Sequence, residues 1–539
     1  MVWTIAGTDS AGGAGIAADQ RAADACGVHL CTVVAAVTAQ NSLEVTGIEV
    51  LDEALLDAQM AALEDDLPPA AVKTGLLGGV AQVEVVARWI DRLRQRAPVA
   101  LVVDPVLGAT TGARFTDEAT LAAYRRLLLP RATLVTPNRR EALALLGRST
   151  HAADAADVAG NDIPALAAAL RALGAQAVCI TGGDDRPFEG TDGPLALDWI
   201  ATEHAAGWLT LPRQDTNHHH GTGCTFATSA AAALARGFVA ADALVLAKMA
   251  TAFALRHGHA AGRGAGPVHA GPGFVFDPSL VPQLSWSAQR HFAPFTAPST
   301  PAPSRPLGLY AIVDRAERLA PVLAAGVRTV QLRTKTPPQA DAAWFDALRA
   351  DVRRAVAEAR AAGAELFIND HRALALEENA PGLHLGQEDV LALTDEERAT
   401  LLAPGAPALG ISSHSLWELA RARSLGPRYI ACGPVWPTLT KAMPWLPQGL
   451  DNLAWWCRMA GAPVVAIGGI LAPAQAEEAA RCGADGVCIV RALGDDPAAT
   501  VPAFAAALRR GTEGPRPAAG WPHGSLPATV AVAIEEAGR

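Results

Sequence analysis

Short apolar runs separated by alanine-rich segments characterise the first half of the chain. The apolar runs are rich in β-branched residues and have the length of strands, and the alanine-rich segments have the length of helices. Strands that alternate with helices are typical of an α/β fold with a mostly parallel sheet. The pattern predicts an α/β domain with strands at 2–6, 32–37, 100–103, 133–135 and 177–180.

Eight strand-like runs follow in the second half, and helical segments such as 342–361 and 416–425 separate several of them. Eight parallel strands that alternate with helices close into a (β/α)8 barrel. We therefore predict a TIM barrel with strands at 309–313, 329–332, 365–368, 382–385, 408–411, 429–432, 463–467 and 486–490.

A stretch rich in proline, serine and alanine at 293–306 separates the two halves and has no sustained apolar period. Such a composition is typical of a semi-rigid linker. No internal repeat relates the halves, so we expect two different folds joined end to end. The predicted organisation is a first domain at 1–275, a linker at 276–306, a barrel at 307–512 and a tail at 513–539.

Composition limits the classes of partner. With 539 residues, of which 50% are hydrophobic and 18% charged, the chain is long enough for two large cores. The net charge of -10 and the pI near 5.8 provide no broad basic field. Nucleic acids and membranes are therefore not expected partners, whereas small molecules are. A homo-oligomer is left open.

The cysteines and the first residues bear on the compartment. Eight cysteines are scattered without a C-x-x-C pair, which favours reduced thiols over a disulfide framework. Residues 1–7 contain no basic region, and no later run of about 18 apolar residues follows. We interpret these features as those of a cytoplasmic protein.

Two glycine-rich segments of the first half are candidates for ligand binding. Glycines in 7–16 permit close approach of the backbone to a ligand. Residues 220–225 lead into an alanine-rich helix at 226–236, whose N-terminal N–H groups and dipole attract an anion. Cys224 lies at that first turn, where the pKa of a thiol can be lowered, so it is a candidate base for an attacking hydroxyl. The alternative is a buried structural cysteine.

Three adjacent histidines at 218–220 precede this helix. Side chains of neighbouring residues in an extended segment cannot readily converge on one ion. We therefore do not expect a zinc site there.

Six motifs of this half lie at 4–19, 38–41, 72–75, 103–106, 136–141 and 221–224. In this order they resemble hydroxymethylpyrimidine and phosphomethylpyrimidine kinases, a ribokinase-like α/β/α family, over residues 1 to about 275. The resemblance implies ATP as the phosphoryl donor and Mg²⁺ as a cofactor. One departure is Thr181, which stands where the family often has Lys. The implied residues are Asp19 and Gln40 for the pyrimidine, Asn138 and Glu141 for magnesium and phosphate, and Gly221, Gly223 and Cys224 for catalysis.

Polar residues of the second half follow the predicted strands at their carboxyl ends, where barrel enzymes build active sites. Gln331, Arg333 and Lys335 alternate at one strand end, so they can share one side, and two cations there suggest a diphosphate. Asp370 and Asp389 follow neighbouring strands and offer oxygen ligands for magnesium. Further candidates are Asn369, Ser412, Thr438, Thr440, Lys441, Gly468, Gly469 and Arg491.

These strand-end motifs resemble thiamine-phosphate synthases from Leu309 to about Leu493. That family joins hydroxymethylpyrimidine diphosphate to thiazole phosphate and releases diphosphate. Arg491 stands where the family commonly has Ser, and Ala373 where an acid is often found. The resemblance implies diphosphate binding by Arg333, Lys335, Asn369 and Lys441, Mg²⁺ on Asp370 and Asp389, substrate positioning by Ser412, Thr438 and Thr440, and thiazole phosphate at Gly468 and Gly469.

The two resemblances share an intermediate, because the diphosphate that the first half would make is the substrate of the second. Two alternatives stay open. Relatives of the two folds include pyridoxal kinases and thiazole tautomerases, although Asp19, Gln40 and the segment 331–335 argue against that pair. A non-catalytic sensor of pyrimidine or thiamine phosphate is the other, suggested by Thr181 and Arg491, and it would show ligand-dependent melting without product.

Overall fold

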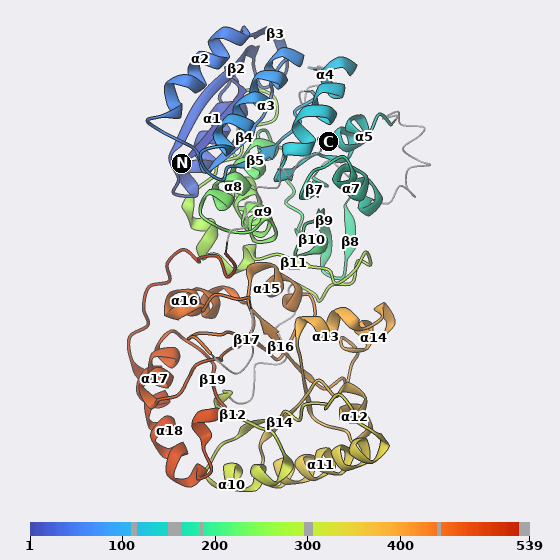
Figure 1. Ribbon diagram of the computed structural model, residues 1–539, viewed down its shortest axis with the longest axis vertical. Coiled ribbons are helices and arrows are strands. Elements are labelled where there is room, and N and C mark those ends of the chain that lie inside the picture. Colours follow the sequence, from blue (N-terminus) through green and yellow to red (C-terminus); the bar gives the residue numbers. More distant parts are fainter. Residues whose placement is uncertain (109–115, 149–162, 184–186, 296–305, 439–443, 528–539) are drawn as a thin grey trace. The chain divides into compact units, whose positions relative to one another are not determined.

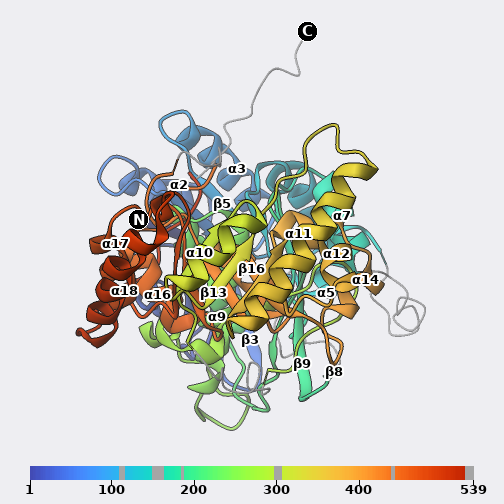
Figure 2. The same cartoon turned by 90° about the horizontal axis from the view of Figure 1, so that it is seen from below.

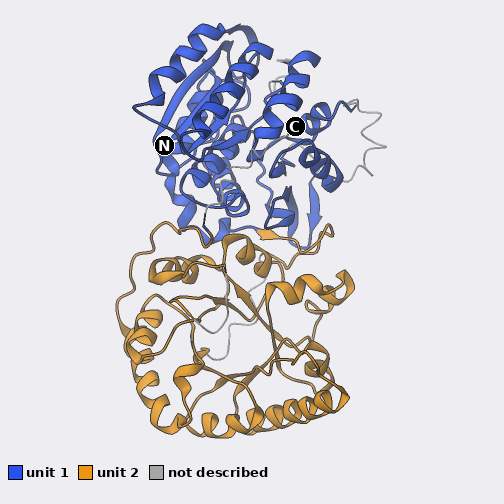
Figure 3. Ribbon diagram, viewed as in Figure 1, with its two compact units in different colours: residues 1–282, 527–539 blue, residues 283–526 orange. Residues whose placement is uncertain are grey.

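The computed structural model describes residues 1–108, 116–148, 163–183, 187–295, 306–438 and 444–527. The chain divides into two compact units, which Figure 3 colours separately. Unit 1 contains Met1–Pro282 and unit 2 contains Gln283–Leu526. No helix among the described residues is both long and apolar enough to cross a membrane.

Unit 1 is built on a mostly parallel sheet with the strand order β10-β9-β7-β6-β5-β4-β1-β2-β3, and β8 pairs with β9 (Figure 1). The central strands are buried over their whole length, as expected where helices cover a parallel sheet. The strands are β1 (Val2–Gly7), β2 (Leu30–Gln40), β3 (Val45–Val50), β4 (Ala71–Thr74), β5 (Ala100–Val103), β6 (Leu134–Val135), β7 (Val178–Ile180), β8 (Phe188–Gly190), β9 (Gly193–Ala201) and β10 (Ala206–Pro212).

The helices of unit 1 pack on this sheet in two groups. In one group α1 packs on α8 and α8 on α9, and in the other α2 packs on α3 and α3 on α4. Alanines let α8 approach β1, β4 and β5 closely, and most of this helix is buried. The helices are α1 (Gly15–Ala25), α2 (Glu53–Glu64), α3 (Val80–Arg94), α4 (Glu118–Ala123), α5 (Arg139–Leu145), α7 (Ile163–Ala172), α8 (Thr222–Ala235) and α9 (Ala240–Arg256).

Unit 2 is a closed barrel of parallel strands, which confirms the predicted fold class. Each strand pairs in parallel with the next, and the last pairs with the first. Inward-facing aromatic rings, among them Tyr310, Phe367 and Tyr429, fill the centre. The strands are β12 (Gly308–Val313), β13 (Thr329–Leu332), β14 (Glu365–Asn369), β15 (Gly382–Leu385), β16 (Ala408–Ser413), β17 (Tyr429–Cys432), β18 (Val464–Ala466) and β19 (Gly486–Ile489).

Helices surround these strands, as the view in Figure 2 shows for α10, α11, α16, α17 and α18. Several begin with a side-chain cap that accepts a hydrogen bond from the first turn, such as Asp341 at α11 and Ser415 at α15. The helices are α10 (Leu319–Ala324), α11 (Ala342–Ala361), α12 (Arg372–Glu377), α13 (Gln387–Ala392), α14 (Asp395–Thr400), α15 (Leu416–Arg423), α16 (Gly449–Met459), α17 (Pro473–Arg481) and α18 (Pro497–Glu513).

Part of the stretch predicted as a linker is attached to the barrel. Trp286 Nε1 donates to Ser424 Oγ at 3.0 Å, and the backbone N–H of Ala293 donates to the Ser424 carbonyl at 2.8 Å. Ser287 Oγ donates to Asp395 at 2.7 Å. Residues 283–293 therefore belong to the packed body of unit 2 and are not a free connection. The linker was predicted from the composition of 293–306, which does not include the buried ring of Trp286.

Candidate active sites of the two units

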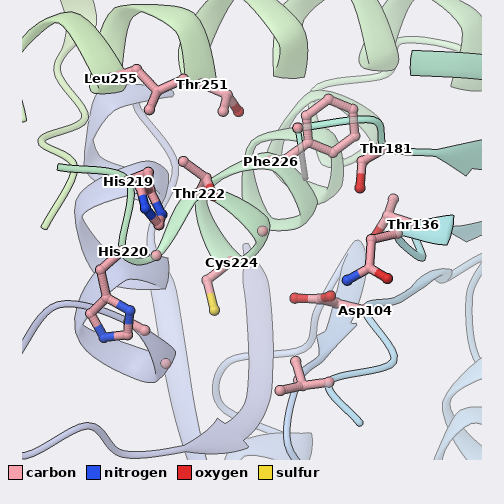
Figure 4. A pocket seen from close by; sticks show the side chains of 18 of the residues that line it. Asp104, Thr136, Thr181, His219, His220, Thr222, Cys224, Phe226, Thr251 and Leu255 are labelled. Carbon is pink, nitrogen blue, oxygen red and sulfur yellow. The ribbon is translucent and has the colours of Figure 1, made fainter. Parts of the chain in front are cut away.

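A pocket of about 490 Å³ opens in unit 1 at the carboxyl ends of its parallel strands. It lies beside β1, where the strand order turns back, the position at which open α/β sheets bind ligands. Figure 4 shows side chains from several elements pointing into it. Of the residues predicted from the sequence, those that line this pocket are Gln40, Asn138, Glu141, Gly221, Gly223 and Cys224.

The N-terminus of α8 faces this pocket. Gly221, the cap, has a left-handed backbone with φ 88°, and a Cβ there would lie 2.2 Å from the Gly13 carbonyl oxygen. Only glycine fits such a position without displacing the neighbouring loop. Thr222, Gly223 and Cys224 follow and also line the pocket, so the first N–H groups of the helix can meet an anion.

Asp9 organises the glycine-rich loop before α1, a role that the sequence prediction did not identify. Its carboxylate accepts hydrogen bonds from the backbone N–H groups of Ala11, Gly13 and Ala14 at 2.8–3.0 Å. His220 Nε2 lies 2.9 Å from the same carboxylate. Burial acts to raise the pKa of Asp9, but His220 and the backbone donors hold it below its ordinary value. Asp9 therefore joins the glycine-rich loop to the segment before α8.

Asp19 is not among the residues that line the pocket, so its contact with the pyrimidine stays a prediction. The side chain is fully buried, and it accepts hydrogen bonds from Lys73 Nζ at 3.0 Å, Thr4 Oγ1 at 2.6 Å and Thr228 Oγ1 at 2.7 Å. A buried ammonium needs such a counter-charge, because transfer out of water disfavours its charged form. Asp19 therefore holds Lys73, and Lys73 lines the pocket.

Lys73 also lies 3.6 Å from Asp104, which follows β5 and lines the pocket. Asp104 Oδ2 is buried without a hydrogen-bond partner. Burial raises the pKa of Asp104 to about 6, although Lys73 opposes the rise. Thr136 Oγ1, at the end of β6, is a second buried oxygen of the pocket without a partner. Such unsatisfied groups are typical of sites that bind a polar ligand or a cation.

Cys224 lies in the same pocket, where Figure 4 shows the Asp104 carboxylate directed toward the side on which Cys224 lies. The expectation that the helix N-terminus lowers the pKa of this thiol is wrong. Burial raises the pKa of Cys224 to about 12, with a further rise from Asp19 and Asp104, and this outweighs the opposing charge of Lys73. The thiol is therefore protonated near neutral pH.

Asn138 and Glu141 form a capping box at the start of α5. Asn138 Oδ1 accepts from the Glu141 N–H, and Glu141 Oε2 accepts from the Asn138 N–H, both at 2.9 Å. The two residues thus have a structural role as a helix cap, and both also line the pocket. Thr181 lies beside them, with its N–H donating to the Pro137 carbonyl at 2.9 Å.

The histidines at 218–220 do not gather on one point. His220 is directed to Asp9, and Nδ1 of His218 is buried without a partner. Among the residues that the structure describes, no group of three or more His, Cys, Asp or Glu side chains is arranged to hold a metal ion.

In unit 2 the guanidinium of Arg333 and the carboxylates of Asp370 and Asp389 meet at the carboxyl ends of the barrel strands. Burial and the neighbouring Asp389 raise the pKa of Asp370, while Arg333 acts in the opposite direction. Asp370 also has a left-handed backbone with φ 63°, which is rare for a residue with a Cβ. Asp389 Oδ2 accepts from the Gly386 N–H at 2.8 Å, which holds it beside Asp370. Two neighbouring carboxylates, one of them with a pKa raised by burial and by the other, are suited to a shared cation.

A buried network of hydrogen bonds runs from this face into the barrel. Asn369 Oδ1 accepts from Gln331 Nε2 at 2.6 Å, and Gln331 Oε1 accepts from the Tyr310 hydroxyl at 2.9 Å. The Tyr310 hydroxyl lies 2.7 Å from that of Tyr429, which in turn lies 2.7 Å from His384 Nδ1. The sequence prediction included Asn369 and Gln331 but not the two tyrosines, whose positions in the sequence are typical of a core.

The network ends at Ser412, whose Oγ lies 2.9 Å from His384 Nε2. Tyr310 donates its single proton to Gln331, so it must accept from Tyr429, and Tyr429 must accept from His384 Nδ1. Burial lowers the pKa of His384 to about 3, so the imidazole is neutral and its Nε2 accepts from Ser412. Ser412 consequently offers an acceptor oxygen to the site, whereas Asn369 offers its amide N–H groups.

The remaining predicted residues of unit 2 follow the ends of the barrel strands. Gly468 and Gly469 follow β18 against the segment after β17, and a Cβ on Gly469 would lie 2.5 Å from Cβ of Trp436. Lys335 and Arg491 are exposed after β13 and β19. Thr438 is half-buried, and Thr440 and Lys441 lie outside the described residues.

Comparison with known proteins relates each unit to a family. Family models match phosphomethylpyrimidine kinase at residues 9–269 and thiamine monophosphate synthase at residues 309–493. A probable chloroplastic thiamine biosynthetic bifunctional enzyme of Oryza sativa subsp. japonica is 34% identical over 509 residues, which cover 92% of this chain and 86% of the rice protein. A chloroplastic thiamine biosynthetic bifunctional enzyme of Arabidopsis thaliana is 33% identical, with 87% and 85% covered.

Other similar proteins match only the first half. A hydroxymethylpyrimidine/phosphomethylpyrimidine kinase of Synechococcus elongatus is 41% identical over 49% of this chain and 95% of its own length. A solved structure of Bacillus subtilis pyridoxal kinase with ADP is 30% identical, with 50% of this chain and 96% of that chain covered and a TM-score of 0.44.

Proposed function

Since this chain belongs to the family of bifunctional thiamine biosynthetic enzymes, we propose that unit 1 and unit 2 supply its two active sites. The kinase phosphorylates 4-amino-5-hydroxymethyl-2-methylpyrimidine and then its monophosphate. The synthase joins the resulting diphosphate to 4-methyl-5-(2-phosphoethyl)thiazole, which yields thiamine phosphate and diphosphate. We assign these reactions to residues 1–275 and 307–512. The observation that carries the kinase assignment is the convergence of Lys73, Asp104 and Cys224 with the α8 N-terminus on one pocket.

In the kinase, phosphoryl transfer requires positioning and charge neutralisation more than covalent help from the protein. We assign the N–H groups of Gly221–Cys224 to the phosphoryl group in transfer, and Cys224 to the hydroxyl that attacks it. Cys224 can take the proton of the hydroxyl only as a thiolate, and Lys73, whose charge lowers the pKa of this thiol, favours the thiolate against the effect of burial. Gln40, near His220 and Asp9, is assigned to the pyrimidine.

ATP is the proposed donor, because the same pocket continues past Phe226 to Thr251 and Leu255 and so has room for a nucleotide beside the phosphate site. Asn138 and Glu141, at the start of α5, would lie beside its phosphates. The backbone of Thr181 contacts Pro137, just before α5. Thr in place of the Lys that the family often has therefore removes a charge but keeps this backbone contact.

In the synthase, departure of diphosphate leaves positive charge on the pyrimidine methylene, so the site has to stabilise the leaving group and hold the thiazole nitrogen in line. We assign Arg333, Lys335, Asn369 and Lys441 to the diphosphate, and Gly468 and Gly469 to the thiazole phosphate. Arg491 is a further candidate for phosphate. Ser412, as an acceptor, suits the amino group of the pyrimidine, and Thr438 and Thr440 are assigned to substrate positioning.

Magnesium is the proposed cofactor of both sites. In unit 2 burial and the neighbouring Asp389 raise the pKa of Asp370, and a cation would neutralise these two carboxylates. In unit 1 the unsatisfied Asp104 Oδ2 is an oxygen donor of the kind that Mg²⁺ takes. When bound, Mg²⁺ would supply positive charge to the phosphate oxygens.

The proposed partners are the pyrimidine and thiazole phosphates. The plant relatives are named as chloroplastic, so the cytoplasmic location stays a prediction for this chain.

Two separate assays test the assignment. The kinase assay follows phosphorylation of hydroxymethylpyrimidine with ATP and Mg²⁺ by mass spectrometry, and the synthase assay supplies the pyrimidine diphosphate and thiazole phosphate directly. Cys224→Ala should lose only the first activity, and Asp370→Asn only the second. Loss of both activities in either variant, or of neither, would contradict the division between the units.

A further inference from the structure

The chain continues beyond the part of the barrel that the synthase family model matches, which ends at residue 493. Helix α18 runs to Glu513, and residues 515–526, which we call the strap, lead from this helix to α16. Ser525 is only 3% exposed. The strap is thus attached by polar groups that are shielded from water.

One side chain of α16, Asn452, attaches the strap through hydrogen bonds to the backbone of the strap. Asn452 Oδ1 accepts from the His523 N–H at 2.8 Å, and Asn452 Nδ2 donates to the His523 carbonyl at 3.2 Å. Asn452 is 1% exposed and donates also to Gln448 Oε1 at 2.9 Å. Because both backbone groups of one residue are used, the strap is fixed in register and in position, which apolar packing alone would not achieve.

Gln448 connects the strap to the active-site face of the barrel. It is fully buried, and its Nε2 donates to Ser525 Oγ at 3.2 Å and to the His414 carbonyl at 2.7 Å. His414 follows β16 two residues after Ser412. His523 Nε2 lies 3.0 Å from the Gln448 carbonyl, and the Leu446 N–H donates to the Ser525 carbonyl at 2.8 Å.

The backbone of Gln448 and Gly449 also holds the start of the connection between β17 and α16. The Gln448 N–H donates to the Pro434 carbonyl at 2.8 Å, and the Gly449 N–H to the Val435 carbonyl at 3.0 Å. The Trp436 N–H then donates to the Gly468 carbonyl at 3.1 Å. A continuous set of hydrogen bonds therefore leads from the strap to the start of this connection and to the glycines after β18.

We propose that the strap is a positioning element of the synthase: through Asn452 and Gln448 it holds the described start of the β17–α16 connection, up to Thr438, in place for the pyrimidine diphosphate. The inference rests on the proposed function of Thr438. The strap touches no substrate, so its effect is on binding of the diphosphate and not on the bond that breaks. A small displacement of a substrate-binding segment is enough to weaken binding strongly.

The first test compares the chain ended after Gly514 with the chain ended after Leu526, which keeps the strap and lacks only residues 527–539. With diphosphate supplied, the shorter chain should show a KM for the pyrimidine diphosphate raised by at least about tenfold. Its kinase activity should match that of the longer chain, which reports that unit 1 is intact. A synthetic peptide of residues 515–526 should lower this KM again, which a merely destabilised barrel would not show.

The second test keeps the full chain and replaces Asn452 by Ala, with Arg458→Ala, an exposed residue of the same helix, as the control. Asn452→Ala should raise the KM for the diphosphate in the same direction, and Arg458→Ala should leave it unchanged. An unchanged KM in Asn452→Ala, or in the chain ended after Gly514, would overturn the proposal. If even the unsubstituted chain made no thiamine phosphate from supplied diphosphate, the proposed function itself would fail, and the inference with it.

Discussion

Lys73→Met tests the buried charge cluster of unit 1. The substitution keeps an unbranched side chain of similar length but removes the ammonium. Asp19 would then keep only two hydroxyl donors, Thr4 and Thr228, and Asp104 would lose its cation at 3.6 Å. Lys73 and Asp19 are both fully buried, so solvent screening does not weaken their interaction. Removal of one partner from a buried ion pair costs about 3–5 kcal/mol, and we expect unit 1 to lose that much stability.

The same change should remove kinase activity. Burial already raises the pKa of Asp104 to about 6, and Lys73 opposes that rise. Without Lys73 the pKa of Asp104 should move higher, so the carboxylate would be neutral at pH 7 and poorly suited to phosphate-bound Mg²⁺. Kinase kcat should fall by a factor of about 100 or more, while the synthase should work normally on supplied diphosphate.

Hydrogen exchange in increasing urea, read on peptides from β1 and β4, would report the stability of unit 1 alone. In the double variant Lys73→Met/Asp19→Asn the loss should be smaller than the sum of the single losses by about 0.5–3 kcal/mol, because the two residues compensate each other. Arg256→Met, which removes the partner of Asp277 at a partly exposed ion pair, is the control and should cost no more than about 1 kcal/mol. A loss below about 1 kcal/mol for Lys73→Met, additive losses in the double variant, or retained kinase activity would refute this reasoning.

Three further predictions concern single groups. Cys224→Ala should lower kinase kcat by a factor of about 100 to 10,000 if the thiol contacts the reacting hydroxyl, and a change below about threefold in the same assay would show that it only packs. Kinase kcat/KM should fall as pH drops below about 6, because the Asp104 carboxylate is ionised only above its raised pKa; this limb of the pH profile should be missing in any residual activity of Asp104→Asn. Tyr429→Phe leaves His384 Nδ1 without its partner at 2.7 Å. Urea unfolding should therefore show unit 2 destabilised by about 1–3 kcal/mol. An unchanged stability of unit 2 would show that the imidazole has turned to another acceptor.

The barrel could be predicted closely because its strands are short apolar runs with polar residues directly after them. Residues 329–332, 382–385 and 429–432 were expected as strands, and β13, β15 and β17 have those bounds. β4 was not predicted as a strand, because it contains Lys73 in a run that otherwise reads as apolar. Its charge is tolerated through Asp19, 54 residues away in the chain, and through Asp104, and such pairs are visible only in three dimensions.

The same limit explains the environment of Asp19 and the wrong expectation for the pKa of Cys224. Asp19 lies in a motif of ligand-binding residues, and nothing local indicates that it is directed into the core. For Cys224 the local argument considered the helix N-terminus, whereas burial, which depends on the whole fold, has the larger effect on the pKa. Asp9, His220 and Asp104 stand within or beside the glycine-rich and strand-end motifs, and that position is the signal by which they could have been found.

The synthase site shows a third kind of limit. The polar ends of the network, Asn369 and Ser412, were predicted because they follow strands. Tyr310, Tyr429 and His384 lie inside strands and join those ends only when the barrel closes. A hydroxyl or imidazole within an otherwise apolar inward-facing position is a signal of such a network, since each buried polar group needs a partner.

The most direct test of the account is one reaction that needs both units. The full chain is incubated with hydroxymethylpyrimidine, thiazole phosphate, ATP and Mg²⁺, and thiamine phosphate is followed by mass spectrometry, with Cys224→Ala alongside. We predict that the unsubstituted chain makes thiamine phosphate, and that Cys224→Ala makes it only when pyrimidine diphosphate is added. Product from neither protein even with added diphosphate, or ligand-dependent melting without any product, would contradict the assignment of two working active sites.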